Sequence, residues 1–316
     1  MAIKSGYMIR TFFLVFFFLL LSACQPAQDS TLAPTPILAT DTETPFVPSE
    51  TPSATWIATP VFTATVTPTA TQDTRLLPRE WSAWPVVPNA SAGAIAIYKK
   101  GLQMGVTPNT FSVVGDCQSK PDVFLGIYAT DRYILGTADQ YLQEAINVFH
   151  DSFMHDSAAV RDGLSAPSAL DPLWADPKRC APAESPLACE LRLYKPMLVF
   201  INLGTNWKAG ASADVYEKYL RKIVDEVIAS GAVPILTNKA DNVEGDHSLN
   251  LATAKVAYDY DIPLMNFWLV ADRLPDRGLD SARDYLYLTP AGWDLRNYTA
   301  LQTLDSVWRT LKGARP

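Results

Sequence analysis

The 316-residue sequence contains little histidine and little cysteine, with three of the first and four of the second. The cysteines show no C-x-x-C spacing, and no pair of histidines lies near them, so the sequence offers no ligand set typical of a zinc site. Basic residues are outnumbered by acidic ones (26 against 33, formal net charge −7), and no basic stripe is interleaved with aromatic residues. This charge pattern argues against nucleic-acid binding. We expect no metal and no organic cofactor.

No apolar run is long enough for a transmembrane helix, which needs about 20 residues. The longest run, residues 12–21, follows Lys4 and Arg10 and ends in small residues, an arrangement typical of a secretory signal. The Leu-Ser-Ala-Cys sequence that ends at Cys24 resembles a bacterial lipobox. This resemblance implies that residues 1–23 are removed and that Cys24 carries the lipid. We therefore expect an extracytoplasmic, membrane-anchored lipoprotein at the cell surface; an ordinary signal or uncleaved anchor with an incidental cysteine is the alternative.

Residues 24–77 are rich in threonine, proline and alanine. Such a segment buries too little apolar surface to offset its loss of conformational entropy, and its prolines favour extended backbone. We interpret it as a disordered linker, with or without glycosylation. The remaining residues, 78–316, are long enough for one globular domain with its own core.

Strands and helices alternate along residues 78–316. Residues 196–203 form a nearly continuous apolar run, as expected of a strand buried on both faces of a parallel sheet. Thr137 and Gln140 match a capping box, and Gly231 suits the left-handed residue after a helix. The other expected strands are 111–114, 233–236 and 263–268, and the expected helices are 90–102, 137–149, 212–230, 249–258 and one that opens at Thr289.

This alternation predicts a three-layer α/β/α domain with a parallel sheet. In such sheets ligands bind at the carboxyl ends of the strands. The segments after three expected strands, which begin near Cys117, Gly204 and Thr237, should therefore meet at one rim of the sheet.

Four short fragments stand in order along that rim: Gly115-Asp-Cys117, the SAAVRDG segment at 157–163, Gly204-Thr-Asn206, and DYLYLTPAG at 284–292. Their order resembles the SGNH (GDSL-type) hydrolase superfamily. That family has a Gly-Asp-Ser block, a glycine block, a Gly-Thr-Asn block and a terminal Asp-x-x-His block, often followed by Leu-Thr-Pro-x-Gly. The resemblance covers roughly residues 110–312 and implies a flavodoxin-like sheet.

The resemblance also implies roles for individual residues. Cys117 stands at the position of the nucleophile, Asp284 at that of the catalytic acid, and Tyr287 at that of the histidine base. The oxyanion-hole donors would be the backbone N–H groups of Cys117 and Gly163 and the side-chain amide of Asn206. The implied substrate is an acyl or acetyl ester of a small molecule or a glycan, and we expect a monomer.

This sequence departs from the family at both the serine and the histidine. Acyl transfer needs a base that works near neutral pH, and tyrosine, whose ordinary pKa is about 10, is unsuited to that role. His155 and His247, both in loops, are candidate replacements for the base, and solvated loop positions are the alternative for each. Three functions therefore stay open: an ester hydrolase that uses Cys117, a catalytically inactive domain that binds an extracellular glycan or another ligand, or a structural or adhesion module whose rim has lost all ligand function.

The remaining cysteines are expected to pair with each other. Cys180 and Cys189 lie at the two ends of a proline-rich segment, CAPAESPLAC, and outside the cytosol such a pair forms a local disulfide. With Cys24 lipidated, Cys117 is left as the free cysteine.

Overall fold

The computed structural model describes residues 73–207 and 210–313. The expected signal peptide, Cys24 and the linker up to residue 72 lie outside these residues. The last part of the expected linker packs against the domain, because Arg75 donates a hydrogen bond to the carbonyl of Tyr258 and bonds the carboxylate of Asp261. None of the helices within these two ranges is long and apolar enough to cross a lipid bilayer.

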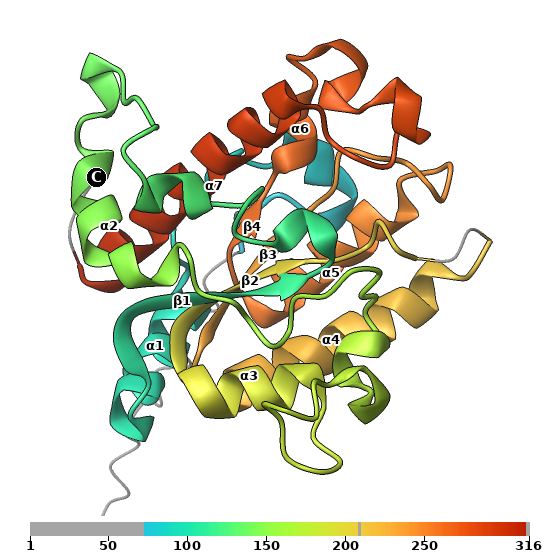
Figure 1. Cartoon of the computed structure of the whole chain (residues 1–316). Helices are drawn as coiled ribbons and strands as arrows, with labels where there is room; N and C mark the ends of the chain where they lie inside the picture. The colour runs from blue at the N-terminus through green and yellow to red at the C-terminus, as the bar shows by residue number, and fades with distance from the viewer. Residues whose placement is uncertain (1–72, 208–209, 314–316) are drawn as a thin grey trace, which may run out of the picture. The chain divides into compact units, whose positions relative to one another are not determined.

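The centre of the domain is a parallel sheet whose strands lie in the order β1-β2-β3-β4 (Figure 1). The strands are β1 (Thr107–Gly115), β2 (Pro196–Asn202), β3 (Val233–Thr237) and β4 (Leu264–Met265). Every residue of β2 is buried, as the apolar run predicted. Gly115 also forms a parallel bridge with Val160, on the edge of β1 that faces away from β2. Val160 follows β1 in the sequence and takes the place of an edge strand beside it. Counted in this way, the strand order is 2-1-3-4-5, which is that of the expected flavodoxin-like sheet.

Helices cover both faces of the sheet and make the three expected layers (Figure 1). One face packs against α1 (Ala92–Met104), α2 (Leu142–Val148), α6 (Phe267–Ala271) and α7 (Pro290–Leu311). The other packs against α3 (Pro186–Tyr194), α4 (Ala213–Ala229) and α5 (Ser248–Tyr260). Two helix caps were anticipated from the sequence: Thr289 accepts from the Gly292 N–H at α7, and Gly231 is left-handed after α4. Ser212, which accepts from the Asp214 N–H, caps α4.

Two predictions about local structure were wrong. Thr137 does not cap a helix: residues 137–139 form a short 3-10 turn, the Gln140 amide bonds the carbonyls of Leu135 and Gly136, and α2 begins only at Leu142. The strand expected over 263–268 is two residues long. Asn266 ends it, because its side chain accepts from the Leu269 N–H and so caps α6.

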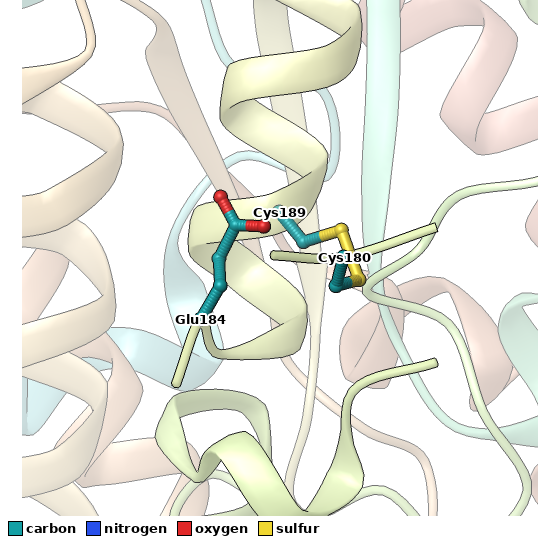
Figure 2. Close-up of side chains that lie close together, drawn as sticks. All are labelled: Cys180, Glu184 and Cys189. Carbon is teal, nitrogen blue, oxygen red and sulfur yellow. A yellow bond between two sulfur atoms is a disulfide. The ribbon is translucent and has the colours of Figure 1, made fainter. Parts of the chain in front are cut away.

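Cys180 and Cys189 form a disulfide (Figure 2). The segment between them is only partly a loop, since Ser185 caps α3 and Cys189 lies inside that helix. Glu184 lies close to both sulfurs, and among the described residues this trio is the only cluster of possible metal ligands. Its sulfurs are bonded to each other and Glu184 bonds Arg192 at 2.6 and 2.7 Å, so the trio does not present a metal site.

A close backbone contact joins α1 to the turn after α4. A Cβ atom on Gly101 would lie 2.0 Å from the carbonyl oxygen of Gly231. We predict that overpacking in Gly101→Ala costs about 1–3 kcal/mol. Alanine gains about 1 kcal/mol over glycine in a helix interior, so the free energy of unfolding should fall by up to about 2 kcal/mol.

Urea unfolding of the full-length protein measures this effect. Gly136→Ala is the matched control, because its nearest contact is a side-chain oxygen of Asp139 at 3.2 Å. The control should change stability by less than about 0.5 kcal/mol. A Gly101→Ala protein as stable as the control would contradict the contact.

Candidate functional site

The end of β1 turns sharply into a 3-10 helix, Cys117–Ser119. Gly115 permits this turn, because a Cβ atom there would lie 2.2 Å from Ser119 Oγ and 2.9 Å from the carbonyl oxygen of Asn202. Cys117 follows at the carboxyl end of the strand, half-buried, at the rim where parallel sheets bind ligands.

A buried carboxylate, that of Asp116, organises this turn. One oxygen accepts a hydrogen bond from the Gln118 N–H at 2.9 Å, and the other accepts from Asn206 Nδ2 at 2.7 Å. Burial raises the pKa of Asp116, and the Gln118 N–H and the charge of Arg296 offset this only in part. Asp116 thus ties the turn after β1 to the loop after β2.

The side chain of Gln118 fixes the position of Tyr287. Its Nε2 donates to the carbonyl of Leu286 and its Oε1 accepts from the Leu288 N–H, both at 3.0 Å. Arg296, buried in α7, donates to the carbonyl of Gln118 at 2.8 Å, and burial lowers its pKa to about 10. The segment on either side of Tyr287 is therefore clamped beside the turn that carries Cys117.

Tyr287 lies near Cys117, because Gln118, the neighbour of Cys117, bonds the residues on either side of Tyr287. Burial raises the pKa of Cys117 and the charge of Asp116 raises it further, while the nearby hydroxyl of Tyr287 lowers it only in part. The net shift is upward. The thiol is thus less ionised at neutral pH than an ordinary cysteine, the reverse of what a nucleophile needs.

Two of the three expected oxyanion-hole donors are available. Gly163 lies just beyond Val160, which pairs with Gly115, so its loop borders the turn of Cys117. Within the described chain, the N–H groups of Cys117 and Gly163 donate to no protein acceptor. The third donor, Asn206, is engaged: its Nδ2 bonds Asp116 at 2.7 Å and lies 3.5 Å from the carbonyl of Leu164.

Asp284 is not bonded to Tyr287 among the described residues. It is exposed, has a positive φ of 54° and lines a cavity whose lining does not include Tyr287. The group stacked on the Tyr287 ring is instead the guanidinium of Arg283, with Cζ 3.4 Å from the ring centroid.

Neither candidate histidine reaches the thiol. His155 Nε2 lies 2.7 Å from the carboxylate of the buried Glu190, and its ring stacks on Tyr194. Burial raises the pKa of Glu190, but hydrogen bonds from His155, Ser112 and the Ala158 N–H outweigh burial and lower it. His155 therefore helps to hold the segment before Gly163.

His247 contacts two tryptophans, with ring centroids 6.1 Å from Trp81 and 5.5 Å from Trp268. The third histidine, His150, lies at the surface beside Asp151. Of the protein's histidines, none supplies a base to Cys117.

Three side chains that shape the site were not predicted from the sequence. Gln118 and Arg296 position the segment of Tyr287, and Lys120 forms an ion pair with Asp162 at 2.6 Å across the loops on either side of Cys117. An Asp two residues before Gln118 is a local signal for the turn. The long-range partners carry no local signal, because they depend on the packing of α7.

No family model matches the sequence, and no curated protein matches it. Among solved structures, a lipase/acylhydrolase from Enterococcus faecalis is 16% identical, with a TM-score of 0.41, over 62% of this chain and 95% of its own.

An esterase, EstA, from Pseudoalteromonas sp. is 19% identical (TM-score 0.38; 62% and 96% covered). A GDSL-like lipase from Bacteroides thetaiotaomicron is 14% identical (TM-score 0.41; 66% and 98% covered). Similarity at this level carries no assignment of activity, which is argued below from the geometry of the site.

The environment of Cys117 predicts its reactivity. Iodoacetamide alkylation, followed by mass spectrometry of the Cys117 peptide, should show a midpoint at higher pH than N-acetylcysteine, because burial and Asp116 disfavour the thiolate. Tyr287→Phe should move the midpoint higher still, since it removes the hydroxyl that lowers the pKa. A midpoint below that of the reference thiol would contradict this description.

Proposed function

We propose that the protein is a cell-surface lipoprotein whose SGNH-like domain binds an extracellular ligand without hydrolysing it. The observation that carries this proposal is the absence of a base at the thiol. Tyr287 stands near Cys117 where the family has its histidine, the pKa of the thiol is raised, and each of the three histidines lies elsewhere. A thioester formed at Cys117 would also lack a base for the water that must cleave it.

Ester hydrolysis through Cys117 is the second candidate function. The observation that favours it is the pair of N–H groups, those of Cys117 and Gly163, that have no acceptor among the described residues. Two such donors can stabilise the charge of a tetrahedral intermediate. They do not replace the missing base, so we rank hydrolysis below binding.

Hydrolysis of p-nitrophenyl acetate by the full-length protein separates the two functions. We expect no turnover that depends on Cys117, so the unmodified protein and Cys117→Ala should give equal rates. Turnover that Cys117→Ala abolishes would refute the binding proposal in favour of the hydrolase.

A double substitution tests the loss of the base directly. Cys117→Ser with Tyr287→His supplies a serine–histidine pair at the two family positions, and general-base catalysis contributes typically 10²–10⁴-fold. We expect at least a tenfold higher esterase rate than in Cys117→Ser alone, which is the matched control. Equal rates in the two variants would count against the assignment of positions 117 and 287.

The lipid anchor is a separate part of the proposal. When the full-length protein is produced in bacteria, Cys24→Ser should abolish the incorporation of labelled palmitate, because it removes the thiol that the lipid would be attached to. Palmitate incorporation that persists in the variant would overturn the assignment.

A further inference from the structure

A cavity of about 450 Å³ lies at the same rim of the sheet as Cys117 but is lined by other residues. Two loops form it: the loop between β3 and α5, which contributes Asn242 and His247, and the segment between α6 and α7, which contributes Asp276, Asp284 and Tyr285. Its volume falls in the range of small-molecule sites, about 300–1,000 Å³. We call it the His247 pocket.

Four of the six polar side chains that line the His247 pocket are not engaged with the protein, whereas Asn242 accepts from the His247 N–H and Arg277 is paired with Asp272. Within the described residues, the carboxylates of Asp276 and Asp284, the hydroxyl of Tyr285 and the imidazole of His247 form no hydrogen bond, and His247 Nδ1 is fully buried. Polar groups that converge on a hollow without protein partners are typical of a ligand site.

The charged side chains behind the pocket behave differently. Lys239 Nζ lies 2.6 Å from carboxylate oxygens of both Asp241 and Glu244, and Asp241 also accepts from Thr205. These groups satisfy one another inside the protein. These buried charges are therefore not available to a ligand, unlike the four unengaged side chains of the lining.

The backbone of the His247 pocket is strained. The described residues include ten non-glycine residues with positive φ, and five of them line this pocket: His247, Asp276, Arg277, Asp284 and Tyr285. Each such conformation costs on the order of 1–3 kcal/mol and persists only where the surroundings hold it, which is commonest at ligand sites.

The residues with positive φ include two adjacent pairs, Asp276 with Arg277 and Asp284 with Tyr285. Contacts of the Arg277 side chain hold the first pair in place. Its guanidinium stacks on Trp268 at 4.0 Å, donates to the Trp268 carbonyl at 3.0 Å and pairs with Asp272 at 2.8 Å. The charge of Arg277 is therefore already compensated, and the pocket offers no unpaired cation to an anionic ligand.

The chemistry of the lining selects the ligand class. Two carboxylates accept hydrogen bonds, and Tyr285, which is 48% exposed, offers an aromatic face. Burial lowers the pKa of His247. The charges of Arg277 and Lys239 lower it further and the charge of Glu244 opposes them, so the ring is mainly neutral near pH 7. No three metal-ligating atoms gather here in the part of the chain that the structure describes. Hydroxyl groups on a ring that can lie against Tyr285 fit this set of partners.

We propose that the His247 pocket, rather than the part of the rim around Cys117, binds a neutral saccharide, with Asp276 and Asp284 accepting hydrogen bonds from its hydroxyl groups and Tyr285 packing against a sugar ring. The proposal rests on the proposed binding function and deepens it, because it names the pocket and the chemical class of the ligand.

Because the protein has only three histidines, NMR signals from the imidazole rings report directly on ligand binding at His247. Full-length protein labelled with ¹³C at histidine Cε1, and purified without a histidine tag, gives three imidazole signals, from His150, His155 and His247. Titration with cellotriose, xylotriose or chitotriose at millimolar concentrations should shift the His247 signal saturably for at least one sugar. The signals of His150 and His155, which lie outside the pocket, are internal controls.

Substitutions then test the assigned contacts. Asp276→Asn and Asp284→Asn should each weaken binding at least tenfold, and because asparagine tolerates left-handed backbone, both variants should fold. Asp214→Asn, the same change at an exposed residue of α4, is the matched control and should leave binding unchanged.

Three results would overturn the proposal: no shift of His247 with any of the three sugars, a shift with the cation spermidine alone, or binding that survives both pocket substitutions. The esterase assay on Cys117 variants is independent of these results. Turnover that depends on Cys117 would refute the proposed non-hydrolytic function and leave the pocket standing, whereas an unresponsive His247 in a hydrolytically silent protein would refute the pocket alone.

Discussion

The arrangement of the rim depends on the buried carboxylate of Asp116. It accepts from the Gln118 N–H in its own turn and from the amide of Asn206 in the loop after β2, so one side chain connects two neighbouring strand ends. Hydrogen bonds to a charged group are worth about 1.5–3 kcal/mol, and leaving such a group unsatisfied in the interior costs more. Asp116 is therefore a constraint on both loops at once.

The same constraint shapes the chemistry at Cys117. The negative charge of Asp116 and the burial of the thiol both disfavour the thiolate. The amide of Asn206, which an oxyanion hole would need, is drawn to Asp116. A hydrolase could tolerate either effect if a histidine accepted the proton of the nucleophile. With Tyr287 in that place, both effects act in the same direction, toward an unreactive thiol.

Much of the fold could be predicted from the sequence, because its signals are local. The apolar run of β2, the Thr-Pro start of α7 and the glycine after α4 each determine structure within a few residues. The meeting of Cys117 and Tyr287 could also be predicted, since parallel topology brings strand ends to one rim.

That Asp284 does not bond Tyr287 within the described chain could not be predicted in this way. Asp284 and Tyr285 both have left-handed backbone. Two backbone hydrogen bonds hold this turn in place: the Tyr285 N–H donates to the Asp280 carbonyl, and the Asp280 N–H donates to the Tyr287 carbonyl. Such turns depend on the packing of the whole segment against α7. The His247 pocket could not be predicted from the sequence either, because its two loops are far apart in the sequence and meet only in the folded chain.

The network at the rim explains how a fold of this kind keeps its geometry while the chemistry at Cys117 changes. Asp116, Gln118 and Arg296 position the loops through bonds that do not involve the thiol. Substitution at position 117 therefore leaves the turn intact, and substitution at position 287 leaves the backbone bonds of Leu286 and Leu288 to Gln118 in place. The segment between α6 and α7 stays bonded to Gln118 as well, so the part of the His247 pocket that it forms does not depend on a reaction at Cys117.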